Sequence, residues 1–182
     1  MLTMIGVAAL VLIVFGAAGS LRSADKGPEA GSVAPEFALN SQGQESVSLK
    51  DFRGKWVVLY FYPKDFTNGC SVEAHNFQRD LSEYENRDAV VLGVSTQDEK
   101  THQAFCTKEG LNFRLLADTN GDVSKKYGSV VNLLVAKLSS RHTFLIDPQG
   151  VVRKVWSTVN VSAHSHEVLA ALDELQETGN TK

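Results

Sequence analysis

The sequence predicts an α/β protein with a mixed central sheet, helices on both faces of that sheet and an N-terminal β-hairpin. Two apolar runs, residues 56–62 and 90–95, flank a segment of helical periodicity, as expected for parallel strands joined by a helix. Asp147-Pro-Gln-Gly150 has the residue preferences of a type I turn and lies between two strand-like segments, so an antiparallel pair follows. The composition, 43% apolar and 21% charged, is that of an ordinary globular domain.

The N-terminal part of the domain begins with a short hairpin. Alternating segments at residues 37–39 and 47–49 flank the polar turn Ser41-Gln42-Gly43. Residues 56–62 are seven consecutive apolar or aromatic residues, typical of a strand buried on both faces, and Pro63 ends the run.

Helical and strand-like segments then alternate. Apolar residues recur at spacings of three and four from Ala74 through Phe77 and Leu81 to Tyr84, which predicts one amphipathic helix. The other expected elements are a strand at 90–95, a helix at 98–109, an extended segment at 113–116, a short helix near 123–127, strands at 142–146 and 151–156, and a helix near 168–175. Residues 129–140 fit no element.

The first 21 residues carry no charge and are mostly small or aliphatic. They are long enough for a signal peptide or a membrane anchor, whereas residues 22–31 resemble a polar linker and residues 32–178 form the folded domain. We therefore expect a protein that is membrane-anchored or exported (periplasmic or secreted), with a membrane tether through residues 1–21. Whether this segment is cleaved stays open, because it lacks the positive residues that usually precede the apolar core of a signal peptide.

The net charge of −3 with interspersed acidic and basic residues argues against a nucleic-acid-binding surface. Asp118–Asp122 resembles a calcium loop with its glycine misplaced and is better explained as a capping turn. His164 and His166 lack further ligands on one face. We expect no metal and no cofactor.

The chain contains two cysteines, Cys70 and Cys106, and no Cys-x-x-Cys pair. Cys70 follows a buried strand and a short loop and opens the next helix. At that position the unpaired N–H groups and the positive end of the helix dipole favour thiolate over thiol. Cys70 is therefore the candidate reactive sulfur.

The segment around Cys70 resembles the peroxidatic motif of the peroxiredoxin family. Pro63, Thr67 and Cys70 form Pro-x-x-x-Thr-x-x-Cys, and Arg141 matches the family's active-site arginine. Val155-Trp156 and His166–Leu169 resemble the bacterioferritin comigratory protein, or peroxiredoxin Q, branch of this AhpC/TSA-type family. The resemblance extends over about residues 31–176 and implies a thioredoxin-like fold.

The resemblance implies a thiol-dependent peroxidase that reduces hydrogen peroxide and organic hydroperoxides. Cys70 attacks one peroxide oxygen and becomes sulfenic acid, while Thr67 and Arg141 bind the oxygens and Pro63 shields the sulfur. Simpler explanations stay open: Thr67 as a helix cap, Arg141 as a surface charge and Pro63 as a strand end.

The sequence departs from the branch pattern at His75, where many members have a resolving cysteine, and at Asn68, where proline is usual. We expect Cys106 to resolve the sulfenic acid by forming a disulfide with Cys70. The alternative is that Cys106 is a core thiol and the reductant is external. Some relatives place the resolving cysteine in that helix.

The implied partners are peroxide substrates and a dithiol reductant such as thioredoxin, and the branch suggests a monomer. Two rival functions remain, a membrane-tethered thioredoxin-like disulfide reductase and a catalytically silent binding scaffold. The reductase needs a dithiol on one turn, but Ser71, Val72 and Glu73 follow Cys70. A scaffold would not need both Thr67 and Arg141.

Overall fold

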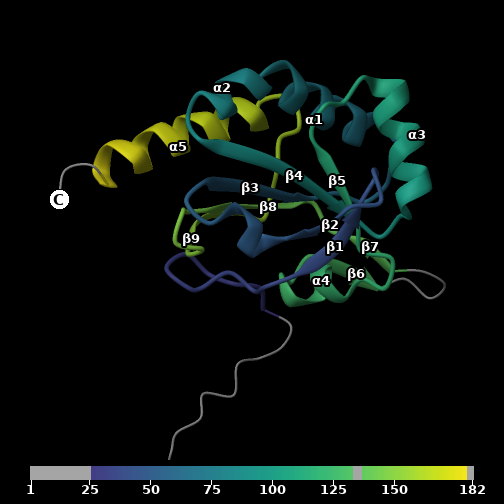
Figure 1. Ribbon diagram of the computed structural model, residues 1–182, viewed down its shortest axis with the longest axis horizontal. Coiled ribbons are helices and arrows are strands. Elements are labelled where there is room, and N and C mark those ends of the chain that lie inside the picture. Colours follow the sequence, from purple (N-terminus) through teal and green to yellow (C-terminus); the bar gives the residue numbers. More distant parts are fainter. Residues whose placement is uncertain (1–25, 133–136, 180–182) are drawn as a thin grey trace, which may run out of the picture.

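The computed structural model describes residues 26–132 and 137–179. They form a seven-stranded sheet in the order β2-β1-β5-β4-β3-β8-β9, with a separate two-stranded ribbon, β6-β7 (Figure 1). The elements are β1 (Ala38–Ser41), β2 (Ser46–Ser48), the 3₁₀ helix η1 (Leu49–Phe52), β3 (Trp56–Phe61), α1 (Asn68–Arg79), α2 (Leu81–Glu85), β4 (Ala89–Ser95), α3 (Glu99–Glu109), β5 (Arg114–Ala117), α4 (Asp122–Lys126), β6 (Val130–Asn132), β7 (Lys137–Ser139), β8 (His142–Ile146), β9 (Val152–Trp156) and α5 (His164–Gly179).

The sheet is mixed, as predicted. β3 pairs with β4 and β4 with β5 in parallel, because a helical connection returns the chain each time to the same end of the sheet. β8 joins the other side of β3 in antiparallel orientation, and β9 follows through the predicted turn, in which Gly150 N–H donates to the Asp147 carbonyl over 2.8 Å. The N-terminal hairpin of β1 and β2 is also confirmed.

Helices cover both faces of the sheet. Side chains of β3 alternate: Val58 and Tyr60 belong to one apolar cluster, and Val57, Leu59 and Phe61 to the other. The first cluster lies beneath α1, α2, α3 and α5, whereas α4 lies on the opposite side of the sheet (Figure 1). This two-faced burial explains why the strand reads as a continuous apolar run.

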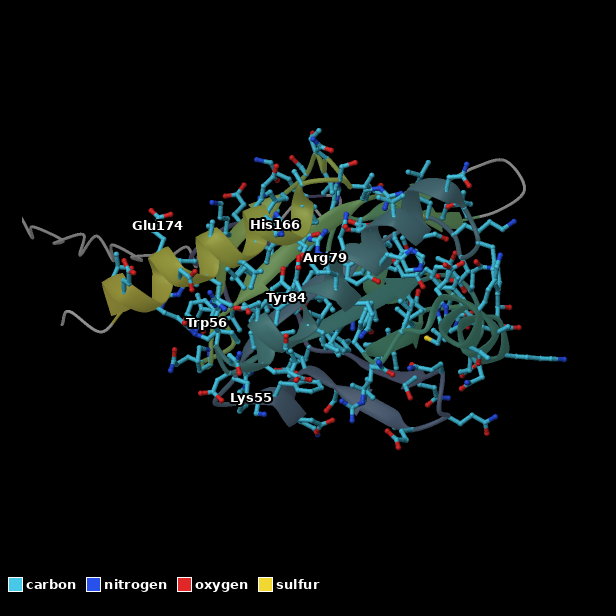
Figure 2. The ribbon with its side chains drawn as sticks, turned by 90° about the horizontal axis from the view of Figure 1, so that it is seen from above. Lys55, Trp56, Arg79, Tyr84, His166 and Glu174 are labelled. Atoms are coloured by element: carbon cyan, nitrogen blue, oxygen red, sulfur yellow. The ribbon has the colours of Figure 1, made fainter. Side chains whose placement is uncertain are left out.

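The structure differs from the sequence prediction at two places. The single helix expected over Ala74–Tyr84 is two helices, because Asp80 leaves the helical region at φ −96° and ψ 9°. After the break, the buried Tyr84 lies near α5 (Figure 2), and its hydroxyl donates to the Ser165 carbonyl over 2.8 Å. Residues 129–140, which fitted no element, contain β6 and β7.

The predicted signal peptide or membrane anchor at residues 1–21 lies outside the described residues. Within residues 26–132 and 137–179, no helix has the length and apolar character needed to cross a bilayer. Part of the expected linker contacts the domain: Gly31 N–H donates to the Val152 carbonyl over 2.7 Å, and the Gly27 backbone packs against Tyr127 and Gly128.

Candidate active site

Cys70 lies in the first turn of α1, just beyond the carboxyl end of β3. Thr67 is the N-cap residue of this helix, and its carbonyl accepts the N–H of Ser71 over 2.9 Å. Cys70 is only 2% exposed. The first N–H groups of a helix have no intrahelical acceptor and carry the positive end of the dipole, so Cys70 lies at the positive end of α1.

Arg141 contacts Cys70 directly. It precedes β8, which runs antiparallel to β3 with His142 opposite Phe61, so the start of β8 meets the end of β3. Arg141 Nη2 donates to Cys70 Sγ over 3.2 Å. Two residues 71 positions apart in the chain thus come together because β8 pairs with β3.

Glu73 is a site residue that the sequence prediction missed. It lies one helical turn after Cys70, is 1% exposed and accepts a hydrogen bond from Nη1 of Arg141. Burial raises the pKa of Glu73 to about 7, although Arg141 acts in the opposite direction. The available signal was a carboxylate three residues after Cys70, on the helix face that also buries Ala74 and Phe77.

Glu73 in turn affects Arg141. Burial alone would lower the pKa of the guanidinium, but the charge of Glu73 and the contact with Cys70 outweigh it, and the pKa of Arg141 lies above its ordinary value. One guanidinium therefore links the sulfur to a buried carboxylate, and its cationic form is the stable one.

Thr67 and Pro63 lie in the loop between β3 and α1. The Thr67 hydroxyl does not cap α1; it donates to the Lys64 carbonyl over 3.0 Å. Because its hydrogen is engaged, the hydroxyl oxygen keeps its lone pairs for an incoming O–H group. Pro63 is partly buried at the start of the same loop.

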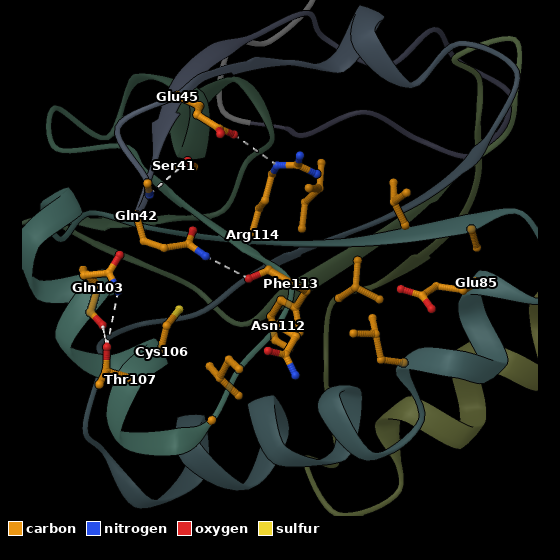
Figure 3. A pocket seen from close by; sticks show the side chains of 18 residues that line it. Ser41, Gln42, Glu45, Glu85, Gln103, Cys106, Thr107, Asn112, Phe113 and Arg114 are labelled. Atoms are coloured by element: carbon orange, nitrogen blue, oxygen red, sulfur yellow. Dashed lines mark hydrogen bonds and ion pairs between the residues drawn. The ribbon is translucent and has the colours of Figure 1, made fainter.

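Cys106 has a different environment. It lies near the end of α3 and is 5% exposed, and burial raises the pKa of its thiol to about 12. Both cysteines are free and belong to the apolar cluster beneath α1 and α3. Cys106 also lines a surface groove of about 650 Å³ between α3 and the β1–β2 hairpin (Figure 3).

In the wall of this groove, the side chain of Gln42 forms hydrogen bonds with the backbone of a neighbouring strand. Its side-chain amide donates to the Phe113 carbonyl over 3.1 Å (Figure 3). The same amide accepts the Leu115 N–H over 2.8 Å, and the Gln42 backbone N–H donates to the Leu115 carbonyl over 3.1 Å. Gln42 thus occupies the hydrogen-bonding groups of β5 beyond the end of β1.

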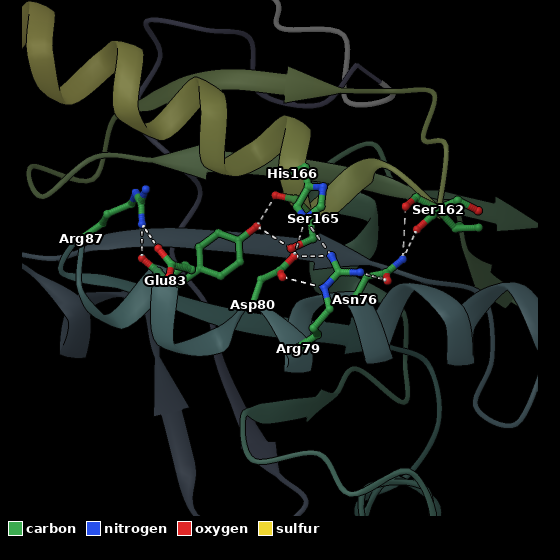
Figure 4. Close-up of polar contacts among 10 residues, drawn as sticks. Asn76, Arg79, Asp80, Glu83, Arg87, Ser162, Ser165 and His166 are labelled. Carbon is green, nitrogen blue, oxygen red and sulfur yellow. Dashed lines mark hydrogen bonds and ion pairs between the residues drawn. The ribbon is translucent and has the colours of Figure 1, made fainter.

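The other candidate sites have structural roles. Asp118 caps α4, accepting the N–H groups of Val123 and Ser124. His164 is fully buried and bonded to Thr143, and burial lowers its pKa to about 4. His166 lies with Arg79 and Asp80 in the polar contact between α1 and α5 (Figure 4). Among the described residues, no group of three potential ligands is placed to hold a metal.

Known proteins resemble this chain over most of its length. The AhpC/TSA family model matches residues 30–155. Peroxiredoxin Bcp of Bacillus subtilis is 36% identical, with 82% of this chain and 98% of the relative covered. Chloroplastic peroxiredoxin Q of Triticum aestivum is 39% identical over 80% of this chain and 67% of the relative.

Solved structures agree with these matches. A cysteine-to-serine mutant of Xylella fastidiosa PrxQ has a TM-score of 0.77 and 33% identity, and the match covers 82% of this chain and 98% of that chain. The Xanthomonas campestris bacterioferritin comigratory protein, solved in complexes that concern its alkyl peroxide reduction activity, has a TM-score of 0.70 and 34% identity, covering 76% and 90%. The expected thioredoxin-like fold is confirmed.

The expected location was wrong. Within residues 26–132 and 137–179 the structure contains no helix that could cross a bilayer. The match to the Bacillus subtilis relative accounts for 98% of that protein, which leaves too few residues in the relative for a separate leader of such length. These findings also give the membrane tether no support.

The sulfur at a helix N-terminus, the arginine beside it and the similarity over four fifths of the chain lead to one assignment. The chain belongs to the AhpC/TSA family of peroxiredoxins, in the bacterioferritin comigratory protein and peroxiredoxin Q branch, and is a thiol peroxidase.

Proposed function

We propose that Cys70 is the sulfur that attacks peroxides, with Arg141 as its electrostatic partner. The observation that carries this proposal is the 3.2 Å contact from Arg141 Nη2 to Cys70 Sγ at the N-terminus of α1. The sulfur attacks the terminal peroxide oxygen, the O–O bond breaks, and the leaving oxygen departs as hydroxide or alkoxide and takes up a proton. Cys70 becomes sulfenic acid.

Charge moves from sulfur to the leaving oxygen during this step. Arg141 faces the sulfur with a fixed positive charge, which Glu73 holds in place through the other guanidinium nitrogen. The Thr67 hydroxyl, which donates to the Lys64 carbonyl, accepts the O–H of the peroxide and so orients the oxygen that is attacked. Pro63, at the start of the loop, shields the Cys70 sulfur from water.

Cys106 resolves the sulfenic acid in this proposal. Its thiol gives up a proton, its sulfur bonds to the sulfur of Cys70, and the sulfenic oxygen leaves as water. Burial holds the pKa of Cys106 near 12, so the thiol becomes a nucleophile only when α3 moves and the sulfur leaves its apolar surroundings. Resolution therefore requires a local opening of α3.

The substrates are hydrogen peroxide and organic hydroperoxides, in line with the alkyl peroxide reduction of the Xanthomonas campestris relative. A dithiol protein such as thioredoxin reduces the Cys70–Cys106 disulfide by exchange. The enzyme acts as a monomer, and its catalytic domain spans residues 32–178.

The test is a peroxide-dependent assay coupled to thioredoxin and its reductase. Cys70→Ser is expected to lower turnover by at least about 1000-fold, because the nucleophile is gone. Cys106→Ser is expected to consume one equivalent of peroxide per chain and then stop with thioredoxin as the reductant.

Mass spectrometry without reductant, after one equivalent of peroxide, identifies the product. An intramolecular Cys70–Cys106 disulfide is expected in the wild-type protein. Full activity of Cys70→Ser would refute the assignment of the nucleophile, and a stable sulfenic acid in the wild-type protein would refute the role of Cys106.

A further inference from the structure

A buried cluster of three polar side chains links the segments that lead to the two cysteines: two of its members precede Cys70 in the chain and the third precedes Cys106. Asp65 accepts a hydrogen bond from the Tyr62 hydroxyl over 2.7 Å, and its other oxygen lies 2.8 Å from Nδ1 of His102. Each of the three residues is at most 1% exposed. The steps of the peroxidase reaction described above use none of them.

The cluster joins the two segments that must separate before a disulfide forms. Asp65 lies in the loop that leads to Cys70, five residues before it, and His102 lies on α3 one turn before Cys106. Gln97, which precedes α3, accepts the backbone N–H of Asp65 over 2.7 Å. This bond adds to the contact between the loop before Cys70 and α3, which we call the joint.

Opening this joint is costly while the cluster is intact. A buried carboxylate separated from its partner keeps the full penalty of desolvation. The loop itself favours rearrangement, because Phe66, next to Asp65, has a φ of 61°, a left-handed conformation that aromatic residues rarely adopt. The loop is therefore strained, and the Asp65–His102 bond keeps it in this strained conformation.

We propose that the Asp65–His102 hydrogen bond, supported by Tyr62, holds α3 against the loop before Cys70 and keeps Cys106 buried. This bond thereby sets the rate at which Cys106 reaches oxidised Cys70. Asp65, His102 and Tyr62 are positioning residues, since they act through the helix and do not touch the reacting sulfurs. The inference rests on the proposed role of Cys106 as the resolving thiol.

The experiment separates the two chemical steps in the full-length protein. Rapid mixing with hydrogen peroxide, quenching with an alkylating reagent and intact mass measurement follow the loss of the Cys70 thiol and the later gain of the disulfide. His102→Leu and Asp65→Leu are expected to speed disulfide formation by about tenfold, because a leucine side chain at either position cannot form the bond between residues 65 and 102. The first step keeps its wild-type rate.

Two further variants protect the test against loss of folding. Tyr62→Phe keeps the ring and removes one hydrogen bond to Asp65, so an acceleration of about threefold is expected. His102→Asn places an amide N–H where Nδ1 stands and is expected to restore a rate close to that of the wild-type protein.

The matched control is Tyr84→Phe, which removes a buried hydroxyl bonded to the Ser165 carbonyl between α2 and α5, away from α3. It lowers stability without loosening the joint, so its disulfide rate is expected to stay unchanged. An equal acceleration in Tyr84→Phe, or wild-type disulfide rates in His102→Leu, Asp65→Leu and Tyr62→Phe, would overturn the inference. If the wild-type protein formed no disulfide at all, the role of Cys106 would fail together with it.

Discussion

Cys70 and Cys106 are both almost inaccessible to solvent, at 2% and 5% exposure, yet their electrostatic surroundings differ. Cys70 lies at the N-terminus of a helix and receives a hydrogen bond from a guanidinium. Cys106 lies near the C-terminal end of α3, and burial raises the pKa of its thiol to about 12.

Burial alone therefore does not distinguish the two thiols, because both are almost inaccessible to solvent. The two sulfurs differ in the charges beside them and in the end of the helix on which each lies. In this fold the same apolar cluster contains both sulfurs, so one core places a sulfur beside a guanidinium and a second sulfur among apolar side chains. Four measurements test this contrast.

The largest difference is expected in alkylation of the native protein at pH 7. Cys106 should react with iodoacetamide at least about 1000-fold more slowly than Cys70, because almost none of it is ionised when its pKa is near 12. Peptide mass spectrometry of timed samples measures both rates. Comparable rates would show that the two environments do not differ in the way described here.

Arg141→Lys tests the charge beside Cys70. A lysine keeps the charge but not the fork that contacts Cys70 and Glu73 at once, so the rate constant for reaction with peroxide should fall by about 100-fold. Stopped-flow competition with a peroxidase of known rate measures it. Alkylation of Cys106 serves as the internal control and should not change; a rate near that of the wild type would rule out bidentate positioning.

Glu73→Gln tests the buried carboxylate through the pH dependence of stability. Burial raises the pKa of Glu73 to about 7, above its ordinary value of 4.5, so the contribution of Glu73 to the free energy of unfolding falls as pH rises from about 4.5 to about 7. The loss is on the order of 2–3 kcal/mol. Urea titrations from pH 4.5 to 8 should therefore show the stability of the variant relative to wild type increasing with pH; a constant difference would contradict the raised pKa.

Cys106→Ala should have the smallest effect. Removing one sulfur atom from the apolar cluster is expected to lower the free energy of unfolding by on the order of 1 kcal/mol. The first reaction of Cys70 with peroxide should keep its rate, because Cys106 is not part of the charged site. Urea titration and a single-turnover experiment check both; a slower first step would mean that the two sulfurs are coupled before oxidation.

Much of this arrangement was predictable from the sequence. The apolar run over residues 56–62, the loop and the helix that begins before Cys70 fix the position of the sulfur through local pattern alone. The contact with Arg141 also agrees with the family motif. The placement of Thr67 and Arg141 near Cys70 supports the predicted roles, which stay predictions until the variants are measured.

Other features depend on tertiary contacts that no local pattern contains. In the sequence, nothing distinguishes Glu73 from other helical glutamates. Its role depends on the hydrogen bond from Arg141, which the pairing of β8 with β3 places beside it. The break at Asp80 is set by the docking of Tyr84 under α5. The same holds for His102, whose partner Asp65 lies 37 residues earlier in the chain.

The side chain of Gln42 has a consequence beyond the groove that it lines. The side chain donates to the Phe113 carbonyl and accepts the Leu115 N–H. It thus forms the pair of hydrogen bonds that a neighbouring β-strand would otherwise form with its backbone. An extended segment from another chain would have to displace both bonds before it could add to this strand. A single amide thus closes the part of β5 that β1 leaves unpaired, whereas the edge strands of the sheet are β2 and β9.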